Sequence, residues 1–165
     1  MHSEADTVIR PIGEPGDLGW VVMAHGEQYA AEFGWDIDFE ALVATIVADH
    51  AALHDPTREA AWIAEVAGLR AGCILCVRGN EPTAAQLRIL LVDPAFRGRG
   101  VGRLLVQQCV DFARQAGYER IDLWTNDVLV PARRIYEAAG FTLVEEEKHH
   151  SFGHDLVGQT WTLDL

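Results

Sequence analysis

One stretch decides the fold of this chain: Leu90-Leu91-Val92-Asp93-Pro94-Ala95-Phe96-Arg97-Gly98-Arg99-Gly100-Val101-Gly102-Arg103. The apolar run from Leu87 to Val92 predicts a buried strand, which ends at Pro94 because proline cannot donate a hydrogen bond to a neighbouring strand. Beyond the glycines, apolar residues recur at helical spacing, at Val101, Leu104, Leu105, Cys109 and Phe112. The stretch therefore predicts a strand, a glycine-rich loop and a helix, in that order.

The glycine-rich loop has the features of an anion-binding site. Its backbone N–H groups lie at a helix N-terminus, where the helix dipole concentrates positive charge. Gly98, Gly100 and Gly102 have no side chain, so a ligand can approach the main chain. The loop also carries three cationic side chains, those of Arg97, Arg99 and Arg103. Together these features predict a phosphate-binding loop.

Length, composition and charge narrow the classes of protein. The chain has 165 residues, of which 49% are hydrophobic and 23% charged, so we expect one globular domain over residues 1–165. No apolar run approaches the ~18 residues of a membrane span, and the polar, acidic start lacks the features of a signal peptide. A net charge of −12 disfavours binding to nucleic acid or anionic membranes. We expect a cytoplasmic protein.

The three cysteines are expected to be buried thiols. Cys73 and Cys76 form a C-x-x-C motif, which in other settings indicates redox chemistry or zinc binding. Here the motif lies in a predicted strand, where side chains three residues apart point to opposite faces. Cys109 lies on the apolar face of the helix that follows the glycines. We expect no metal site.

Hydrophobic periodicity and turn residues predict seven strands and four helices. The strands are expected over residues 7–10, 61–66, 70–77, 85–92, 120–125, 141–147 and 158–165. The helices are expected over 17–33 with Asp17 as N-cap, from Asp36 or Asp38 to the loop at Pro56, over 100–117, and over 131–139 with Pro131 at the first position. Residues 148–155 are expected to form a polar loop. The order predicts an α/β (α+β) fold with a central mixed sheet, in which strand 120–125 is parallel to its neighbour.

At this point the chain resembles the GNAT superfamily of acetyl-CoA-dependent N-acetyltransferases. Arg97-Gly98-Arg99-Gly100-Val101-Gly102 fits the Q/R-x-x-G-x-G/A signature of that superfamily. The preceding Leu91-Val92-Asp93-Pro94 and the later Ile135-Tyr136-Glu137-Ala138-Ala139-Gly140-Phe141 match as well. The last part of the chain further resembles the acetyltransferase domain of MarR–GNAT fusion proteins, either as a stand-alone copy or as a piece of a longer protein. A Walker loop is excluded because no Gly-Lys-Ser/Thr follows. A dinucleotide-binding loop is disfavoured because the preceding strand belongs to an antiparallel meander.

The resemblance implies a role for each matched residue. The backbone of Leu90, Leu91 and Val92 would pair with the pantetheine arm of acetyl-CoA, and the N–H groups from Arg97 to Arg103, Val101 included, would hold the pyrophosphate. Tyr136 would lie near the thioester sulfur. A tyrosine hydroxyl can protonate the leaving thiolate as a general acid, although a core aromatic is the structural alternative. No cysteine matches a nucleophile position, so the resemblance implies direct attack by a primary amine on acetyl-CoA.

Two departures from the family pattern leave roles open. Many members have an asparagine seven residues before the tyrosine, where this chain has Leu129. Asn126 is the nearest asparagine, and either caps the helix or reaches the cofactor. Many members also place a glutamate base on the strand that holds Leu90, where this chain has Gln86 and Arg88. The candidate bases are then His149 and His150, with His154 and the three glutamates Glu145, Glu146 and Glu147 as further candidates.

The acceptor site is the least determined part. Arg88 is a charged residue in a predicted buried strand, so it either grips a substrate carboxylate, forms a structural ion pair with an acidic side chain of a neighbouring strand, or is exposed on an open face of the sheet. Tyr29 and Glu32 lie at the junction of the first two helices, where we expect acceptor contacts, together with Phe33, Trp35 and Phe39. The sequence predicts transfer of an acetyl group to an amine of a small molecule, such as an amino acid, or of a protein. The alternative is a non-catalytic acyl-CoA-binding module. Similar domains are often homodimers, which is a possible assembly here.

Overall fold

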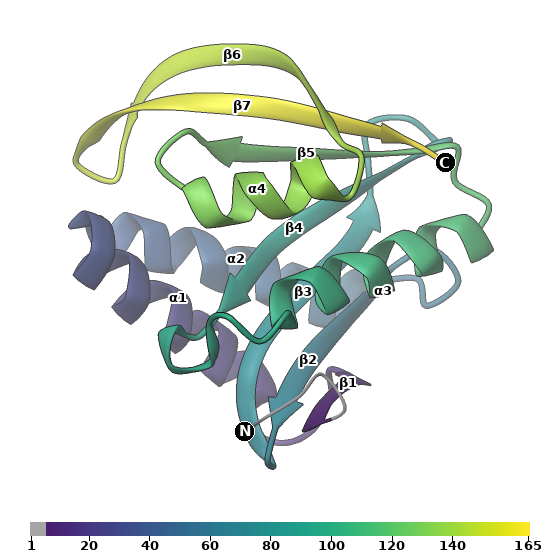
Figure 1. The fold of residues 1–165 in the computed structure, drawn as a ribbon, viewed down its shortest axis with the longest axis horizontal. Helices are drawn as coiled ribbons and strands as arrows, with labels where there is room; N and C mark the ends of the chain where they lie inside the picture. The colour runs from purple at the N-terminus through teal and green to yellow at the C-terminus, as the bar shows by residue number, and fades with distance from the viewer. Residues whose placement is uncertain (1–5) are drawn as a thin grey trace.

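The computed structural model describes residues 6–165 and has one seven-stranded sheet flanked by four helices (Figure 1). The strands lie in the order β1-β2-β3-β4-β5-β7-β6. Their bounds are Thr7–Pro11 (β1), Ala60–Val66 (β2), Leu69–Arg78 (β3), Ala84–Val92 (β4), Arg120–Asn126 (β5), Thr142–Ser151 (β6) and His154–Asp164 (β7). The helices are Asp17–Phe33 (α1), Ile37–Leu53 (α2), Val101–Gln115 (α3) and Val130–Ala138 (α4). The predicted mixed sheet and element order are confirmed.

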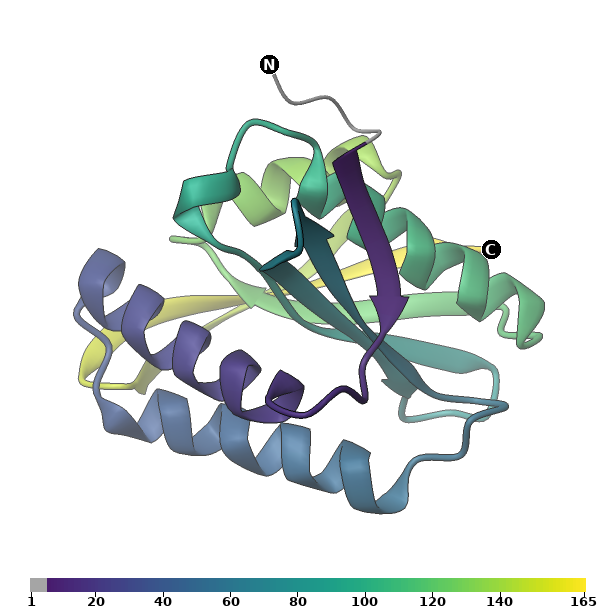
Figure 2. The same ribbon diagram turned by 90° about the horizontal axis from the view of Figure 1, so that it is seen from below.

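The helices cover opposite faces of the sheet, α1 and α2 on one face and α3 and α4 on the other (Figure 2). Each face has its own hydrophobic core. Leu105 of α3 and Trp161 of β7 belong to the first core, whereas Val21 of α1 and Val43 of α2 belong to the second. Cys76 lies in the first core and Cys73 in the second. The prediction that these two thiols are buried on opposite faces is therefore confirmed.

Strands β4 and β5 form the parallel pair of the sheet, and they separate after a short contact. They are in register from Ala84 opposite Arg120 to Leu87 opposite Leu123, although β4 continues to Val92 and β5 to Asn126. Beyond Leu87, β4 carries a bulge toward β3, because two of its residues lie opposite one residue of β3. Ile89 in this bulge has φ of 48°, an outlier for a β-branched residue. The gap between the two strands opens where the bulge begins.

Two helix starts differ in how they are capped. Asp36 is the N-cap of α2, as predicted, and its carboxylate accepts a hydrogen bond from the Asp38 N–H. The prediction for α1 is wrong, because Gly16 is the N-cap and Asp17 is the first helical residue. The buried Asp17 carboxylate instead accepts hydrogen bonds from Arg10 and Arg70, which hold its pKa well below the usual range. This ion cluster fixes the start of α1 on β1 and β3.

The prediction of a loop over residues 148–155 is also wrong. Strands β6 and β7 form one long hairpin, with register pairs down to Ser151 opposite His154. The two-residue turn places Phe152 at φ of 57° and Gly153 at φ of 83°, the positive values that tight hairpin turns need. The Asp36 N–H donates to the Phe152 carbonyl at 3.1 Å, so the turn lies against the start of α2. In α4, Pro131 is the second helical residue and not the first, because the helix begins one residue earlier than predicted, at Val130.

None of the helices within residues 6–165 is long and apolar enough to cross a membrane.

Candidate active site

A cleft of about 320 Å³ lies where the gap between β4 and β5 meets the glycine-rich loop. Its walls come from α1, the end of β4, the loop, the first turn of α3, and α4. The residues predicted to bind the cofactor that line this cleft are Leu90, Leu91, Val92, Arg97, Gly98, Gly100, Val101, Gly102 and Arg103. The structure therefore brings nearly all of the predicted cofactor residues together.

Each glycine of the loop is required by the local geometry. Gly98 and Gly100 have φ of 80° and 75°, and Gly100 is the N-cap of α3. A Cβ at Gly102 would lie 2.6 Å from Ile135 Cδ1 of α4, so the absence of a side chain lets α3 and α4 pack. Because the first N–H groups of a helix have no partner within it, this loop presents donors to the cleft.

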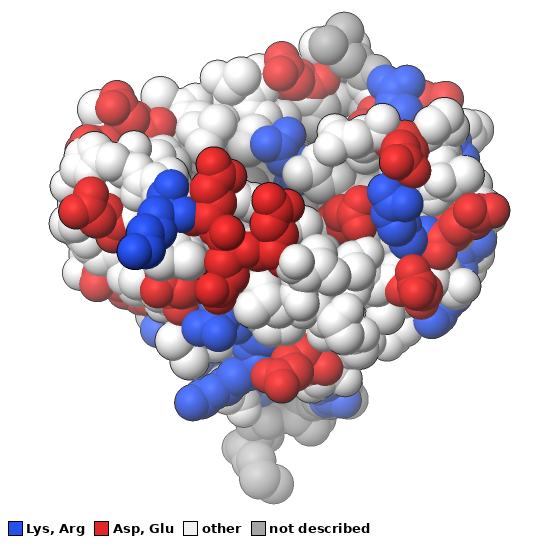
Figure 3. Space-filling model, turned by 90° about the horizontal axis from the view of Figure 1, so that it is seen from above, with Lys and Arg blue, Asp and Glu red and all other residues white. Residues whose placement is uncertain are grey.

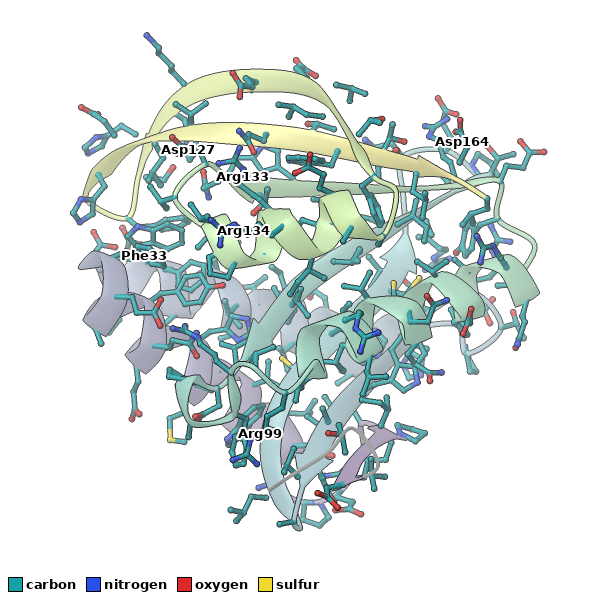
Figure 4. The ribbon with its side chains drawn as sticks, viewed as in Figure 1. Phe33, Arg99, Asp127, Arg133, Arg134 and Asp164 are labelled. Atoms are coloured by element: carbon teal, nitrogen blue, oxygen red, sulfur yellow. The ribbon has the colours of Figure 1, made fainter. Side chains whose placement is uncertain are left out.

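Of the charged residues near the glycine-rich loop, Arg97 and Glu32 line the cleft and Arg99 does not. The Arg97 guanidinium forms an ion pair with the Glu32 carboxylate of α1, and both residues line the cleft. Glu32 thus lies in the cofactor cleft, not in the second cavity described below. Arg99 does not line the cleft; its guanidinium lies 5.6 Å from the centre of the Phe96 ring. Figure 4 shows Arg99 beside the loop, away from Phe33 and Arg134.

A second cavity of about 130 Å³ lies beside the cleft, on the α2 side of β4. Aromatic rings close part of it. The rings of Tyr29 and Phe39 are stacked with their centres 4.7 Å apart, and the ring of Phe152 in the hairpin turn meets that of Phe39 edge to face, with 5.1 Å between the centres. Tyr29, Leu90 and Leu129 line both the cleft and this cavity. The two spaces are therefore neighbours that share these walls next to the open edge of β4.

Tyr136 lines the second cavity from α4 and is 5% exposed. Burial raises the pKa of its hydroxyl above the ordinary value, and the nearby Tyr29 and Cys109 add to this shift. The hydroxyl is therefore protonated at neutral pH, the state that a proton donor needs. Its ring also packs against Phe141 at 5.9 Å, so the catalytic and the core interpretations of Tyr136 are compatible.

Arg88 is half-buried and lines the same cavity. Burial lowers the pKa of its guanidinium, and the charge of Asp49 on α2 opposes this shift. Within residues 6–165 no carboxylate oxygen lies within 4.0 Å of the guanidinium. The predicted ion pair with a neighbouring strand is thus not formed, and the cavity contains a partly desolvated cation without a paired anion.

Asn126 and His149 are linked by a hydrogen bond. The Nε2 atom of His149 lies 2.7 Å from Asn126 Oδ1, and its Nδ1 lies 2.9 Å from Ser151 Oγ. Asn126 lines the second cavity and does not line the cleft, whereas His149 lines neither. Both ring nitrogens of His149 have partners, with Nε2–H donating to the amide oxygen and the Ser151 hydroxyl donating to Nδ1.

The other candidate bases lie outside both spaces. His150 is 67% exposed at its side chain and bonds Asp155, and His154 Nε2 lies 3.0 Å from the Gly34 carbonyl oxygen. Figure 3 shows acidic side chains on the face that β6 presents, where Glu145, Glu146 and Glu147 are exposed. None of these residues lines the cleft or the second cavity.

One histidine on the buried face of α1 also lines the second cavity. His25 of α1 is 1% exposed, and its Nδ1 lies 2.7 Å from the Val21 carbonyl oxygen. Burial lowers the pKa of His25 to about 4. The available signal was a histidine at a core position of an amphipathic helix, which by itself does not indicate function.

The Acetyltransferase (GNAT) family profile matches residues 27–141. The chain belongs to this family. An uncharacterized N-acetyltransferase of Schizosaccharomyces pombe is 30% identical over 125 residues, which cover 75% of this chain and 76% of that protein. N-acetylaspartate synthetase of Xenopus tropicalis is 36% identical over 90 residues, 54% of this chain and 33% of that protein. This chain therefore spans only part of the synthetase.

Solved structures described as acetyltransferases have the same fold. The structure of yncA of Salmonella typhimurium, described as a putative acetyltransferase with its cofactor acetyl-CoA, aligns with a TM-score of 0.74 at 18% identity and covers 96% of this chain and 94% of its own. A second structure, described as a putative phosphinothricin N-acetyltransferase, aligns with a TM-score of 0.77 at 20% identity over 96% of this chain and 98% of its own. At these identities the likeness establishes the fold of this GNAT protein.

We expect Gly100→Val to weaken the binding of coenzyme A, with no larger loss of stability than the control variant Gly117→Val shows. Gly100 and Gly117 both have positive φ, but Gly117 lies at the far end of α3 and a Cβ there would meet nothing within 4 Å. Each valine should cost about 1–2 kcal/mol of stability through backbone strain. Calorimetric titration should show coenzyme A affinity falling more than ~10-fold for Gly100→Val, with Gly117→Val unchanged. Equal affinities for the two variants would contradict the phosphate-loop assignment.

Proposed function

We propose that this GNAT protein transfers the acetyl group of acetyl-CoA to the primary amine of a small, carboxylate-bearing acceptor by direct attack. The observation that carries the proposal is that two neighbouring spaces share walls at the open edge of β4. One space is lined by the phosphate-binding loop and the other by Arg88 and Tyr136. A thioester in the first and an amine in the second would come into contact at Leu90.

The cleft fits acetyl-CoA in its shape and its donors. An extended pantetheine arm has amide groups that can pair with a free strand edge, and β4 beyond Leu87 has such an edge on the β5 side. The first turn of α3 and the cations of Arg97 and Arg103 suit the pyrophosphate. The apolar stretch formed by Pro131, Ala132 and Ile135 of α4 faces the same cleft and suits the aliphatic parts of the arm.

The chemistry needs an oxyanion donor and a proton for the leaving group. Attack of a neutral amine on the thioester carbonyl forms a tetrahedral oxyanion, which a backbone N–H at the free edge of β4 can stabilise. Collapse breaks the C–S bond and releases the coenzyme A thiolate. Tyr136 is protonated and lies at the acceptor side of the meeting point, so it can donate its proton to the sulfur as the general acid.

The unpaired cation of Arg88 supports an acceptor with a carboxylate. A half-buried guanidinium without a counter-ion is costly, and a bidentate carboxylate would complete its hydrogen bonds. N-acetylaspartate synthetase of Xenopus tropicalis, one of the relatives, is named for an N-acetylated amino acid. A cavity of about 130 Å³ favours a small molecule over a folded protein surface.

The proposal is tested by a panel of primary amines with acetyl-CoA, in which release of free coenzyme A is followed. The panel pairs each α-amino acid with the amine that lacks its carboxylate. We expect turnover with at least one amino acid, at a higher kcat/KM than with its decarboxylated partner. Binding of acetyl-CoA without turnover across the panel would favour a non-catalytic acyl-CoA-binding module instead.

Tyr136→Phe should lower kcat about 100-fold because it removes the proton for the leaving thiolate. The affinity for coenzyme A should stay the same, since Tyr136 does not line the cleft. Steady-state kinetics and calorimetric titration on the same preparation measure the two quantities. A wild-type kcat in Tyr136→Phe would remove the hydroxyl from the mechanism.

Arg88→Met should raise the KM for a carboxylate-bearing acceptor by more than ~10-fold, since charge-assisted hydrogen bonds contribute about 1.5–3 kcal/mol each. The KM of the decarboxylated partner should change little. Arg88→Lys keeps the charge without the planar fork, so it should fall between Met and the wild type. An equal rise of KM for both acceptors would make Arg88 a structural residue.

A further inference from the structure

One buried polar atom at the second cavity has no partner. The Nε2 atom of His25 is buried and makes no hydrogen bond within the described part of the chain. Such atoms are rare, because leaving a buried polar group unsatisfied costs about 1–3 kcal/mol. His25 lines the cavity together with Arg88 and Tyr136. An unsatisfied acceptor at this place suggests a ligand that supplies the missing hydrogen.

The other ring nitrogen determines which tautomer His25 has. Nδ1 lies 2.7 Å from the Val21 carbonyl oxygen, which accepts only, so Nδ1 must carry the proton. Nε2 is then a lone pair that accepts hydrogen bonds. Because burial lowers the pKa of His25 to about 4, the ring is neutral at physiological pH. The Ile89 carbonyl also lies near the ring, but a carbonyl accepts only and supplies no hydrogen to this lone pair.

We infer that His25 is a catalytic residue whose Nε2 accepts a hydrogen bond from the attacking amine and takes its proton as the amide forms. The inference rests on the proposed function. It names the base that the sequence analysis sought among the histidines of the last hairpin. One N–H of the amine would bond Nε2, which would direct the nitrogen lone pair toward the thioester carbonyl at the meeting point of the two spaces.

The other groups at the cavity cannot fill this role. Arg88 is a cation, Tyr136 is a protonated donor, and Gln86 and Asn126 have amide side chains that do not take up a proton. Both nitrogens of His149 already have partners. Of the ionisable side chains that line the cavity, His25 is thus the one with a vacant proton-accepting atom.

The proton balance of the step closes. The amine nitrogen forms the C–N bond, the C–S bond breaks, and Tyr136 protonates the sulfur. The nitrogen then carries one proton too many, and a protonated amide nitrogen is acidic enough to give it to an imidazole of low basicity. The resulting imidazolium faces two carbonyls, those of Val21 and Ile89, both of which favour the charged ring. The proton then passes to solvent, and Tyr136 is reprotonated.

Two matched substitutions separate a catalytic from a structural role of His25. In Asn, the side-chain amide can replace Nδ1 and keep the bond to Val21, but it does not reach the position of Nε2. In Gln, the amide oxygen can reach the position of Nε2 and accept a hydrogen bond from the amine, but it cannot take up the proton, so it restores only the orientation of the amine. We expect His25→Asn to lower kcat/KM for the acceptor about 100-fold, with His25→Gln at least ~10-fold more active than His25→Asn. The affinity of both variants for coenzyme A should equal that of the wild type.

A structural role predicts the reverse order, with His25→Asn at least as active as His25→Gln, and that order would overturn the inference. The two proposals fail in different ways. Absence of turnover by the wild-type protein with every amine would contradict the proposed function, whereas turnover by the wild type with the reverse order of the two variants would contradict only the role of His25. Nitrogen NMR of the wild-type histidines supplies a readout that needs no variant. Addition of coenzyme A and a turned-over amino acid should shift the Nε2 resonance of His25 toward the hydrogen-bonded position, whereas an unchanged resonance would contradict the contact.

Discussion

The separation of β4 from β5 is the constraint on which the rest of the site depends. The two strands share four register pairs and then diverge at Leu87 and Leu123, next to the bulge at Ile89 where β4 stays paired with β3. A continuous parallel pair would leave neither a free strand edge nor a gap between the layers of helices. The bulge thus lies beside both the free strand edge to which we assign the pantetheine arm and the walls that the two cavities share.

Keeping a β-branched residue at positive φ costs stability, of the order of 1–3 kcal/mol, so the surroundings of the bulge must hold it. Helix α1 lies against it, and α1 is in turn fixed at its start by the buried carboxylate of Asp17 between Arg10 and Arg70. His25 lies two turns further along the same helix, near the Ile89 carbonyl. The stability of the α1 start and the geometry of the acceptor cavity are therefore parts of one arrangement.

Most of the cofactor side could be predicted from the sequence, because its determinants are local. Glycines at alternate positions between a strand and an amphipathic helix indicate a loop with positive φ at a helix N-terminus, and the structure has positive φ at Gly98 and at Gly100, the N-cap of α3. The acceptor side depends on contacts between residues far apart in the chain. Positive φ at Ile89 has no sequence signal, and the pairing of Glu32 with Arg97 joins residues 65 positions apart. The polar residues around Phe152 and Gly153 led to the prediction of a loop over residues 148–155, although these two residues form a tight hairpin turn.

The central claim is that the thioester and the acceptor amine meet in one continuous space at the open edge of β4. A bisubstrate compound tests it most directly: coenzyme A joined through an acetyl linker to the nitrogen of an amino acid that the enzyme acetylates. Calorimetric titration should show this compound binding at least ~100-fold more tightly than coenzyme A alone, because it fills the cleft and the second cavity together and its carboxylate reaches Arg88. An affinity no higher than that of coenzyme A would contradict the account.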